Sequence, residues 1–319
     1  MAAPTAPSTQ LSSITLTWKE DPSAGPIPAH VYFPSATQNN DSHPIALLFH
    51  AGGFVLGTTD MIPKNQIANL VARGFVVVTP EYRLCPQVSL SDGPIRDAKE
   101  VYQWTQSALP ALLLSQENPI KVDPSRIVAM GHSAGGQLAL TTGLCPNPPR
   151  AIVDFYGCKY LDDESWTKPL PMFAAIPDQP QDFISKIYDG PQAITSLPMF
   201  VDGKPALSDP RCAWYIQQLK NGTSISSIVP DGDFARVDAT KHFSASFPPT
   251  YFLHGGDADV FVNYRLSVRA HEELKGLGVE TELVIGEEVG HVFDLIIQDT
   301  DPLFVKYVVP ALDFLERHV

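Results

Sequence analysis

The sequence MGHSAGGQ, from Met130 to Gln137, decides the fold that we expect for this chain. It follows an apolar run at 126–130, which is typical of a buried strand, and leads into AGGQLALTTG at 134–143, whose small residues suit a helix. At the junction, Ser133 has a glycine two residues to either side. A sharp strand-to-helix turn leaves no room for side chains at those two positions and lifts the serine to the carboxyl edge of the sheet. The pattern predicts that Ser133 is presented for nucleophilic chemistry beside a helix N-terminus.

The rest of the chain alternates between strand-like and helix-like segments. Two half-exposed strands that look antiparallel come first, at 12–20 and 27–34. Nearly continuous apolar runs, typical of strands buried on both faces, occur at 44–50, 74–80, 126–130, 151–157, 249–255 and 280–286. Helix-like segments occur at 62–74, 97–109, 134–143, 263–278 and 301–319. This order predicts an α/β protein with a mostly parallel central sheet flanked by helices.

One interval interrupts the alternation. Roughly ninety residues, rich in proline and aromatic side chains, separate Gly157 from Phe247, far more than a crossover connection needs. We expect 158–247 to be a lid or cap insertion folded over one edge of the sheet. The α/β core would then consist of 1–157 and 248–319. A small second domain is the alternative interpretation of the interval.

Composition excludes several classes of partner. The 319 residues carry a net charge of −13 without a cluster of Lys and Arg, which argues against nucleic acid. No apolar run approaches the ~18–20 residues that cross a bilayer, and no basic start precedes an apolar block as in an export signal. The four cysteines lack metal-ligand spacing and are expected to be reduced thiols. We therefore expect a cytoplasmic protein that acts on a small molecule, in an oligomeric state that the sequence leaves open.

A serine hydroxyl needs a base, and the base in turn needs an orienting group. We expect His291 to be the base, because GEEVGHVFD at 286–294 forms a loop between the last apolar strand and the C-terminal helix. His132 is too close along the chain to swing into line with Ser133. His254 stands at a strand end and is interpreted as a turn or core residue.

The orienting acid is expected between the serine and the histidine, after a strand. LHGGDADVFVNY at 253–264 offers Asp257 and Asp259. Each has a valine three residues later, so the local pattern does not separate the two. Glu287 and Glu288 are remote third choices that suit a solvated loop.

A glycine-rich segment is expected to stabilise the oxyanion that forms when a serine attacks a carbonyl group. FHAGGFVLG at 49–57 follows a predicted buried strand, and its Gly52 and Gly53 allow the backbone to approach a reacting carbon closely. Together with the N–H of Ala134 they would form an oxyanion hole, in which each donor contributes about 3–4 kcal/mol. A plain glycine-rich turn is the alternative.

These segments together resemble the α/β-hydrolases, and most of all the hormone-sensitive-lipase-like esterases, small carboxylesterases and arylformamidases. Segments similar to that family's motifs are HAGGF at 50–54, EYRLCPQ at 81–87, the serine block at 123–139, the acid-bearing stretch at 254–279 and GHVF at 290–293. The resemblance covers about 27–156 and 249–319, in the family's order. It implies the nucleophile Ser133, the acid Asp259, the base His291 and oxyanion donors at Gly52, Gly53 and Ala134.

Three departures from the family's pattern stand out. Ala51 replaces the first glycine of the oxyanion motif, and HGGDAD carries one residue more than usual, which puts the choice of acid in doubt. The predicted insertion matches none of the family's motifs, and we expect it to shape substrate choice.

The resemblance implies a serine hydrolase without metal or cofactor that cleaves a carboxylic ester or lactone of a small apolar metabolite through an acyl-enzyme. The same groups could cleave an amide, a formamide or a thioester. A small-molecule receptor and a cyclising protein are alternatives from other classes, because the fold supports both. The layout also resembles proteins of fungal secondary metabolism.

Overall fold

A computed structural model describes residues 11–34 and 42–319; the first ten residues, where we expect no export signal, lie outside the described part. Eight strands form one sheet in the order β1-β2-β4-β3-β5-β6-β9-β10. The pairs β1–β2 and β2–β4 are antiparallel, and all the other neighbours are parallel. The strands are β1 (Leu11–Asp21), β2 (Gly25–Pro34), β3 (His43–Phe49), β4 (Val76–Pro80), β5 (Val122–His132), β6 (Ile152–Phe155), β9 (Thr250–Gly255) and β10 (Thr281–Gly286). The predicted mostly parallel sheet is confirmed.

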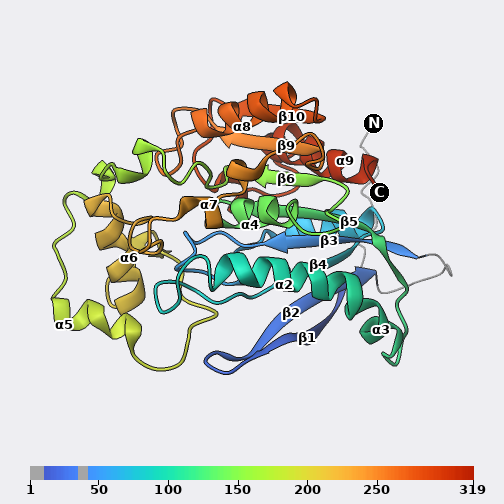
Figure 1. Ribbon diagram of the computed structural model, residues 1–319, viewed down its shortest axis with the longest axis horizontal. Helices are drawn as coiled ribbons and strands as arrows, with labels where there is room; N and C mark the ends of the chain where they lie inside the picture. The colour runs from blue at the N-terminus through green and yellow to red at the C-terminus, as the bar shows by residue number, and fades with distance from the viewer. Residues whose placement is uncertain (1–10, 35–41) are drawn as a thin grey trace.

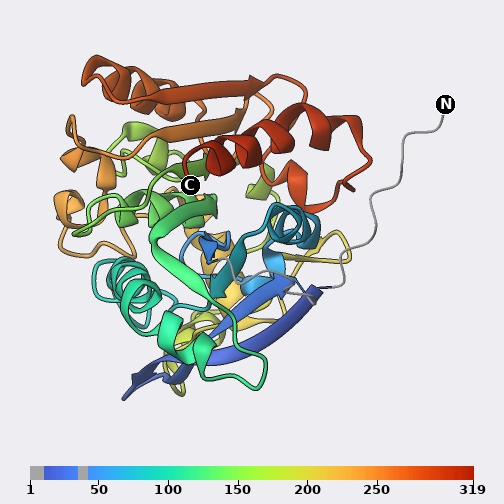
Figure 2. The ribbon, with the colours of Figure 1, turned by 90° about the vertical axis from the view of Figure 1, so that its right-hand side faces the viewer.

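Helices cover both faces of this sheet. They are α1 (Lys64–Ala72), α2 (Pro94–Ser107), α3 (Leu109–Leu114), α4 (Ala134–Thr142), α5 (Gln181–Ile184), α6 (Pro210–Asn221), α7 (Phe234–Val237), α8 (Arg265–Gly276) and α9 (Val309–Arg317). The apolar side chains of α1 and α9 pack in one buried cluster, and those of α2, α4, α6 and α8 pack in another. Figure 2 shows α9 and α2 on opposite sides of the sheet. None of the helices in the described residues is both long enough and apolar enough to cross a membrane.

Two helix predictions needed correction at prolines. The helix expected over 97–109 ends at Ser107, and the separate α3 follows with Pro110 in its first turn. The segment expected to be a helix over 301–319 is helical from Pro302 to Arg317, but it contains a wide π-helical turn at Phe304–Val308, and α9 begins after this turn at Val309, directly before Pro310. Because proline has no N–H to donate, a regular helix does not run through either position.

The predicted insertion at 158–247 lies beyond the carboxyl ends of the parallel strands, where α5 and α6 stand apart from the sheet in Figure 1. Its two short strands, β7 (Phe200–Val201) and β8 (Lys204–Pro205), pair only with each other. The main element is α6, which begins where Asp209 accepts a hydrogen bond from the N–H of Cys212 (2.8 Å) and ends at the left-handed Gly222. The carboxyl edge of the sheet is thus covered by 158–247.

Candidate active site

Ser133 occupies a strained turn between β5 and α4. Its φ and ψ are 54° and −117°, a backbone conformation that side-chain-bearing residues rarely adopt. A Cβ at Gly131 would lie 1.9 Å from the carbonyl oxygen of Gly135, and a Cβ at Gly135 would lie 2.2 Å from that of Phe49. Both glycines are therefore required by close backbone packing. The turn has the geometry that the sequence MGHSAGGQ predicts.

Ser133, His291 and Asp259 lie in one continuous hydrogen-bonded row. The His291 Nε2 atom is 2.9 Å from Ser133 Oγ, and its Nδ1 atom is 2.8 Å from Asp259 Oδ2. The three residues come from the turns that follow β5, β9 and β10, which end at one edge of the sheet with β6 between β5 and β9. Asp257, the alternative acid, is exposed to solvent. The structure therefore brings together Ser133, His291 and Asp259, and leaves Asp257 outside the row.

The Asp259 carboxylate is buried and held at both oxygens. Oδ1 accepts hydrogen bonds from the backbone N–H groups of Phe261 and Val262, each at 3.0 Å. Burial by itself would raise the pKa of Asp259, but the imidazoles of His291 and His254 beside it hold the pKa well below its usual range. The carboxylate is consequently ionised whenever the protein is folded near neutral pH, and it can fix the Nδ1–H tautomer of His291.

The loop after β3 carries the predicted oxyanion donors. Gly52 and Gly53 have φ angles of 133° and 61°. A Cβ at Gly52 would lie 1.9 Å from the carbonyl oxygen of Leu56, and one at Gly53 would lie 1.8 Å from the Tyr215 hydroxyl oxygen. Among the residues that the structure describes, none accepts a hydrogen bond from the backbone N–H of Gly52 or Gly53. Glycine is thus needed at both positions, and both amides are available to a ligand. The third predicted donor, Ala134, is the first residue of α4, next to Ser133.

Residues from the predicted insertion hold this loop in place. The Arg211 guanidinium, on α6, donates hydrogen bonds to the carbonyl oxygens of Val55 (3.2 Å) and Cys85. One turn further along α6, the Tyr215 ring packs over Gly53. Burial raises the pKa of the Tyr215 hydroxyl, so that this group remains a proton donor. The predicted insertion therefore contributes directly to the surroundings of this loop, residues 50–57, which we call the oxyanion loop after the predicted role of its glycines.

A second histidine–carboxylate pair lies buried behind the first. The His132 Nε2 atom is 3.1 Å from Asp294 Oδ2, and Asp294 also accepts hydrogen bonds from Gln66 Nε2 (2.6 Å) and the Tyr156 hydroxyl. The Tyr156 ring packs edge-on against His291 with 4.8 Å between the ring centroids. Burial tends to raise the pKa of Asp294, but His132 and the two other donors hold the pKa below its usual value. This cluster holds the loop that carries His291 against β5 and α1.

A pocket of about 370 Å³ opens over Ser133 and His291. Most of its wall is apolar and comes from both the core and the predicted insertion; representative lining residues are Met61, Trp166, Leu170, Met199, Phe200 and Ile225. Ile296, also in the lining, is 83% exposed and stands at the rim. Cys158 lines the pocket as well, and burial raises the pKa of its thiol to about 12, which leaves it protonated. The pocket suits a small apolar molecule whose reactive group meets Ser133.

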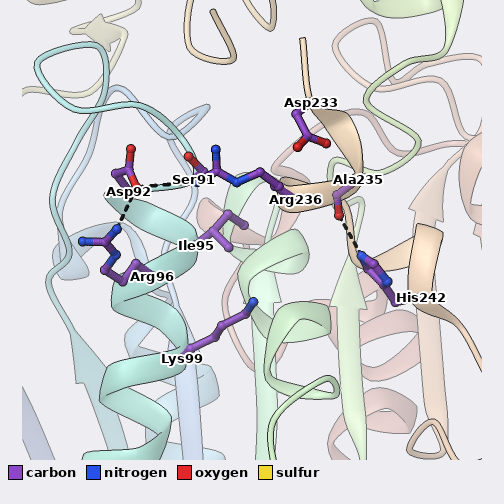
Figure 3. Close-up of a pocket in the computed structure, with 9 residues that line it drawn as sticks. All are labelled: Ser91, Asp92, Ile95, Arg96, Lys99, Asp233, Ala235, Arg236 and His242. Atoms are coloured by element: carbon purple, nitrogen blue, oxygen red, sulfur yellow. Dashed lines mark hydrogen bonds and ion pairs between the residues drawn. The ribbon is translucent and has the colours of Figure 1, made fainter. Parts of the chain in front are cut away.

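A second hollow, of about 520 Å³, lies between α2 and α7 (Figure 3). Its wall is charged: Arg96 pairs with Asp92 at 2.7 Å, and Arg236 lies 3.8 Å from the same carboxylate. Among the described residues, His242 Nε2 donates a hydrogen bond only to the carbonyl oxygen of Ala235 (2.7 Å). No nucleophile and base are paired in this hollow, so the chemistry is expected in the apolar pocket. Within the described residues no group of three His, Cys, Asp or Glu side chains is arranged to hold a metal ion.

Comparison with known proteins agrees with this architecture. Residues 46–169 match the model of a family described by its alpha/beta hydrolase fold. The chain has the α/β-hydrolase fold. The matched segment includes the oxyanion loop, Ser133 and the start of the predicted insertion.

Curated relatives of this hydrolase-fold chain include large fungal proteins. Non-reducing polyketide synthase pkbA of Emericella nidulans is 29% identical over 92% of this chain, and non-reducing polyketide synthase prhL of Penicillium brasilianum is 31% identical over 91%. Methylphloroacetophenone synthase of Cladonia uncialis is 30% identical over 91%. The chain spans 13% of the length of each of these relatives.

Solved structures share the fold at lower identity. Thermogutta terrifontis esterase 2 phosphorylated by paraoxon is 19% identical, with a TM-score of 0.63 over 96% of this chain and 94% of that chain. A Staphylococcus aureus protein of unknown function is 18% identical, with a TM-score of 0.69 over 95% and 99%. The resemblance of this chain to esterases is thus established at the level of the fold.

Several residues around the row could not be found from the sequence. Tyr215 and Arg211 lie in the predicted insertion, which matches no family motif, and nothing in the helix DPRCAWYIQQLKNG marks which side faces the pocket. Asp294 did carry a signal, since it lies three residues after His291, on the same loop. The sequence predicts His254 to be a turn or core residue; it is fully buried, and its Nε2 atom also lies 3.1 Å from Asp259 Oδ2.

Proposed function

We propose that this chain is a cofactor-independent serine hydrolase that cleaves a carboxylic ester or lactone of a small apolar metabolite. One observation carries the proposal: the His291 imidazole is within hydrogen-bond distance of both Ser133 Oγ and Asp259 Oδ2, in the wall of an apolar pocket. A serine hydroxyl gains nucleophilic strength only next to such an oriented base.

In the proposed reaction, Ser133 Oγ attacks the carbonyl carbon while its proton passes to His291 Nε2. Asp259 stabilises the imidazolium that forms, and the backbone N–H groups of Gly52, Gly53 and Ala134 stabilise the negative charge on the former carbonyl oxygen. Collapse of this tetrahedral species breaks the bond to the alkoxide, which takes the proton from Nε2 and leaves an acyl-enzyme. Water then attacks in the same way, releases the acid and restores the Ser133 hydroxyl.

The proposed acyl group is polyketide-derived, and the proposed setting is fungal secondary metabolism in the cytoplasm. The relatives named polyketide synthases support this acyl class, and so does the apolar wall of the pocket. The free thiols of Cys85, Cys145, Cys158 and Cys212 fit a reducing compartment.

The same relatives favour a second candidate, the cleavage of an acyl thioester. Polyketide chains are built as thioesters, and a thiolate leaving group would need less help from His291 than an alkoxide because it is less basic. Rates on matched oxygen and sulfur esters with one acyl group separate the two candidates. A thioester preference of 100-fold or more in kcat/KM would favour the second.

The decisive experiment is Ser133→Ala. We expect the variant to lose turnover of short p-nitrophenyl esters and of the matched thioesters, and to lose labelling by a fluorophosphonate probe, with an unchanged circular dichroism spectrum. Ser165→Ala, which changes a serine in the same pocket wall, is the control and should keep the label. Turnover that survives in Ser133→Ala would overturn the proposal, and tight ligand binding by an unlabelled wild type would favour a receptor.

A further inference from the structure

His254 is a buried titratable residue that the proposed reaction does not use. It lies in β9, one residue before the strand ends, and is fully buried. Its Nε2 atom is 3.0 Å from the carbonyl oxygen of Val262 and 3.1 Å from Asp259 Oδ2. Its Nδ1 atom is 2.7 Å from the hydroxyl oxygen of Ser267, on α8. The His254 ring thus contacts both Asp259, which belongs to the Ser133–His291–Asp259 row, and Ser267 on α8, which lies outside that row.

The contacts continue from Ser267 to a buried cation. Lys159 Nζ is 2.9 Å from Ser267 Oγ and also donates to the carbonyl oxygen of Gly157. The Lys159 side chain is completely buried, and its ammonium forms an ion pair with the equally buried Asp154 at 2.9 Å. A buried ammonium group is stable only when it is paired and hydrogen-bonded in this way. The position of this positive charge is therefore fixed.

The direction of each hydrogen bond in this series follows from the chemistry of the groups. The Lys159 ammonium can only donate, so the Ser267 oxygen accepts from it, and the Ser267 proton is free to point at His254 Nδ1. Nε2 faces two oxygen atoms that can only accept, so the single proton of a neutral ring lies there. Nδ1 then carries no proton and accepts from the Ser267 hydroxyl. The Nε2 end therefore selects the tautomer, and the Lys159–Ser267 end is compatible with it.

We propose that His254 is a positioning residue for the Asp259 carboxylate, held as its neutral Nε2–H tautomer by Lys159 acting through the Ser267 hydroxyl. In this state His254 donates toward Val262 and Asp259 and closes the turn whose backbone N–H groups hold Oδ1. The carboxylate then cannot rotate away from His291. The catalytic consequence rests on the proposed serine hydrolase function, whereas the tautomer does not.

The charge state of His254 matters because its ring lies beside the Asp259 carboxylate, which also pairs with His291. A protonated His254 would compete with the His291 imidazolium for Asp259. The charged groups around the ring are Asp259, Lys159 and Asp154, and burial is the largest influence that lowers the pKa of His254, with the Lys159 charge acting in the same direction. The two carboxylates act in the opposite direction but do not prevail. The negative charge of Asp259 is thus left for His291.

The tautomer can be read directly by nuclear magnetic resonance of the full chain with ¹⁵N-labelled histidine. We expect His254 to carry its proton on Nε2 and none on Nδ1 throughout pH 6–9. Ser267→Ala removes the donor to Nδ1 and should abolish this fixed tautomer, whereas Ser267→Thr keeps a hydroxyl and should preserve it. Resonances that place the wild-type proton on Nδ1, or a charged ring at pH 7, would overturn the proposal.

The positioning role is tested on the same proteins by kinetics. His254→Leu removes the donor, and we expect kcat to fall about 30-fold with KM within about twofold, since a hydrogen bond toward a carboxylate is lost. His254→Gln places an amide N–H near the Nε2 position and should recover most of kcat. Ser267→Ala keeps the imidazole, and we expect it to reduce kcat by about 5- to 10-fold. This variant supplies the kinetic test if His254→Leu does not fold.

Failure of the positioning role and failure of the proposed hydrolase function would give different results. If the folded His254→Leu and Ser267→Ala proteins both keep the wild-type kcat and the hydrogen-bonded His291 Nδ1–H resonance, the positioning role is wrong. If the wild type has no hydrolase activity and takes no fluorophosphonate label, the proposed function fails instead. In that case the His291 Nδ1–H resonance in the resting protein still decides whether His254 positions Asp259.

Discussion

Two histidine–carboxylate pairs lie next to each other in this protein, and only one of them adjoins the pocket. His291 and Asp259 are 2.8 Å apart and His132 and Asp294 are 3.1 Å apart, so the pairs are alike in separation. His291 Nε2 also lies within hydrogen-bond distance of Ser133 Oγ, and His291 lines the pocket. His132 is fully buried, and among the described residues its polar contacts are with Gln66 and Asp294. A paired histidine is therefore poised for chemistry only where its second nitrogen meets a reactive group at a cavity.

The two histidines also differ in how their distance from Ser133 along the chain relates to their distance from it in space. His132 adjoins Ser133 in the chain, but it ends β5 with its ring directed to the α1 and α9 side of the sheet. His291 is 158 residues away and meets the serine oxygen directly. Successive residues of a strand point to opposite faces, so a neighbour in the sequence is poorly placed to act as base.

The largest expected contrast comes from replacing the two histidines. His291→Ala should lower kcat about 100,000-fold, because Ser133 loses its base. His132→Gln should keep kcat within about tenfold and lower the melting temperature, because it disturbs a buried histidine–carboxylate contact. Steady-state kinetics and thermal unfolding measure both. A folded His132→Gln protein with no fluorophosphonate labelling would break the contrast.

The two carboxylates should differ in the same sense. Asp259→Asn should lower kcat about 10,000-fold with little change of KM, since an amide in that place favours the wrong tautomer of His291. Asp294→Asn should act mainly on stability. The exposed Asp257→Asn is the matched control and should be neutral in both measurements. Loss of activity in Asp257→Asn, with Asp259→Asn active, would reverse the assignment of the acid.

A smaller effect is expected from the hydroxyl that the predicted insertion places beside Gly53. Tyr215→Phe should lower kcat about tenfold and leave KM nearly unchanged, if its hydroxyl donates to the oxyanion together with the backbone amides. Tyr188→Phe, at an exposed tyrosine of the same stretch, is the control. Equal losses in kcat for both variants would mean that the hydroxyl has no special position.

The smallest expected effect is on acid stability. The folded-state pKa values of Asp259 and Asp294 both lie below the usual value of 3.8, so each carboxylate stabilises the fold above about pH 4 and this contribution is lost as pH falls toward the folded pKa. Each Asp→Asn variant should therefore lose less unfolding free energy than wild type between pH 5 and 3. Urea titrations across that range measure the slope. If both variants show the wild-type dependence of unfolding free energy on pH, the lowered pKa values of Asp259 and Asp294 do not contribute to acid stability.

The sequence predicts the parts of the site that follow strand ends. Buried apolar runs locate β5, β9 and β10, and a parallel sheet brings the turns after them to one edge, so Ser133 and His291 could be predicted to meet. The choice between Asp257 and Asp259 could not be made from local pattern. It depends on how the turn after Gly255 folds, which is determined by the backbone donors Phe261 and Val262.

The remaining residues depend on packing over long separations. Lys159 lies in the loop after β6, His254 in β9 and Ser267 in α8, and no spacing rule relates them. The sequence also could not predict which residues of 158–247 contact the pocket. The short turns and proline-rich connections of this segment have no periodicity that would indicate which side faces the core. The sequence predicted Ser133 and His291, which meet in the structure, but it left most of their surroundings undetermined.

The contact of Arg211 with the oxyanion loop limits how substrate range can change. Because this guanidinium bonds the carbonyl oxygens of Val55 and Cys85, α6 and the oxyanion loop form one structural unit. A chimera that exchanged the whole of 158–247 with a relative would place a foreign helix against a loop it did not evolve with. Variation at the pocket rim, around Trp166 and Phe200, leaves that unit intact. New specificities should therefore arise by changes at the rim, with α6 inherited together with the core.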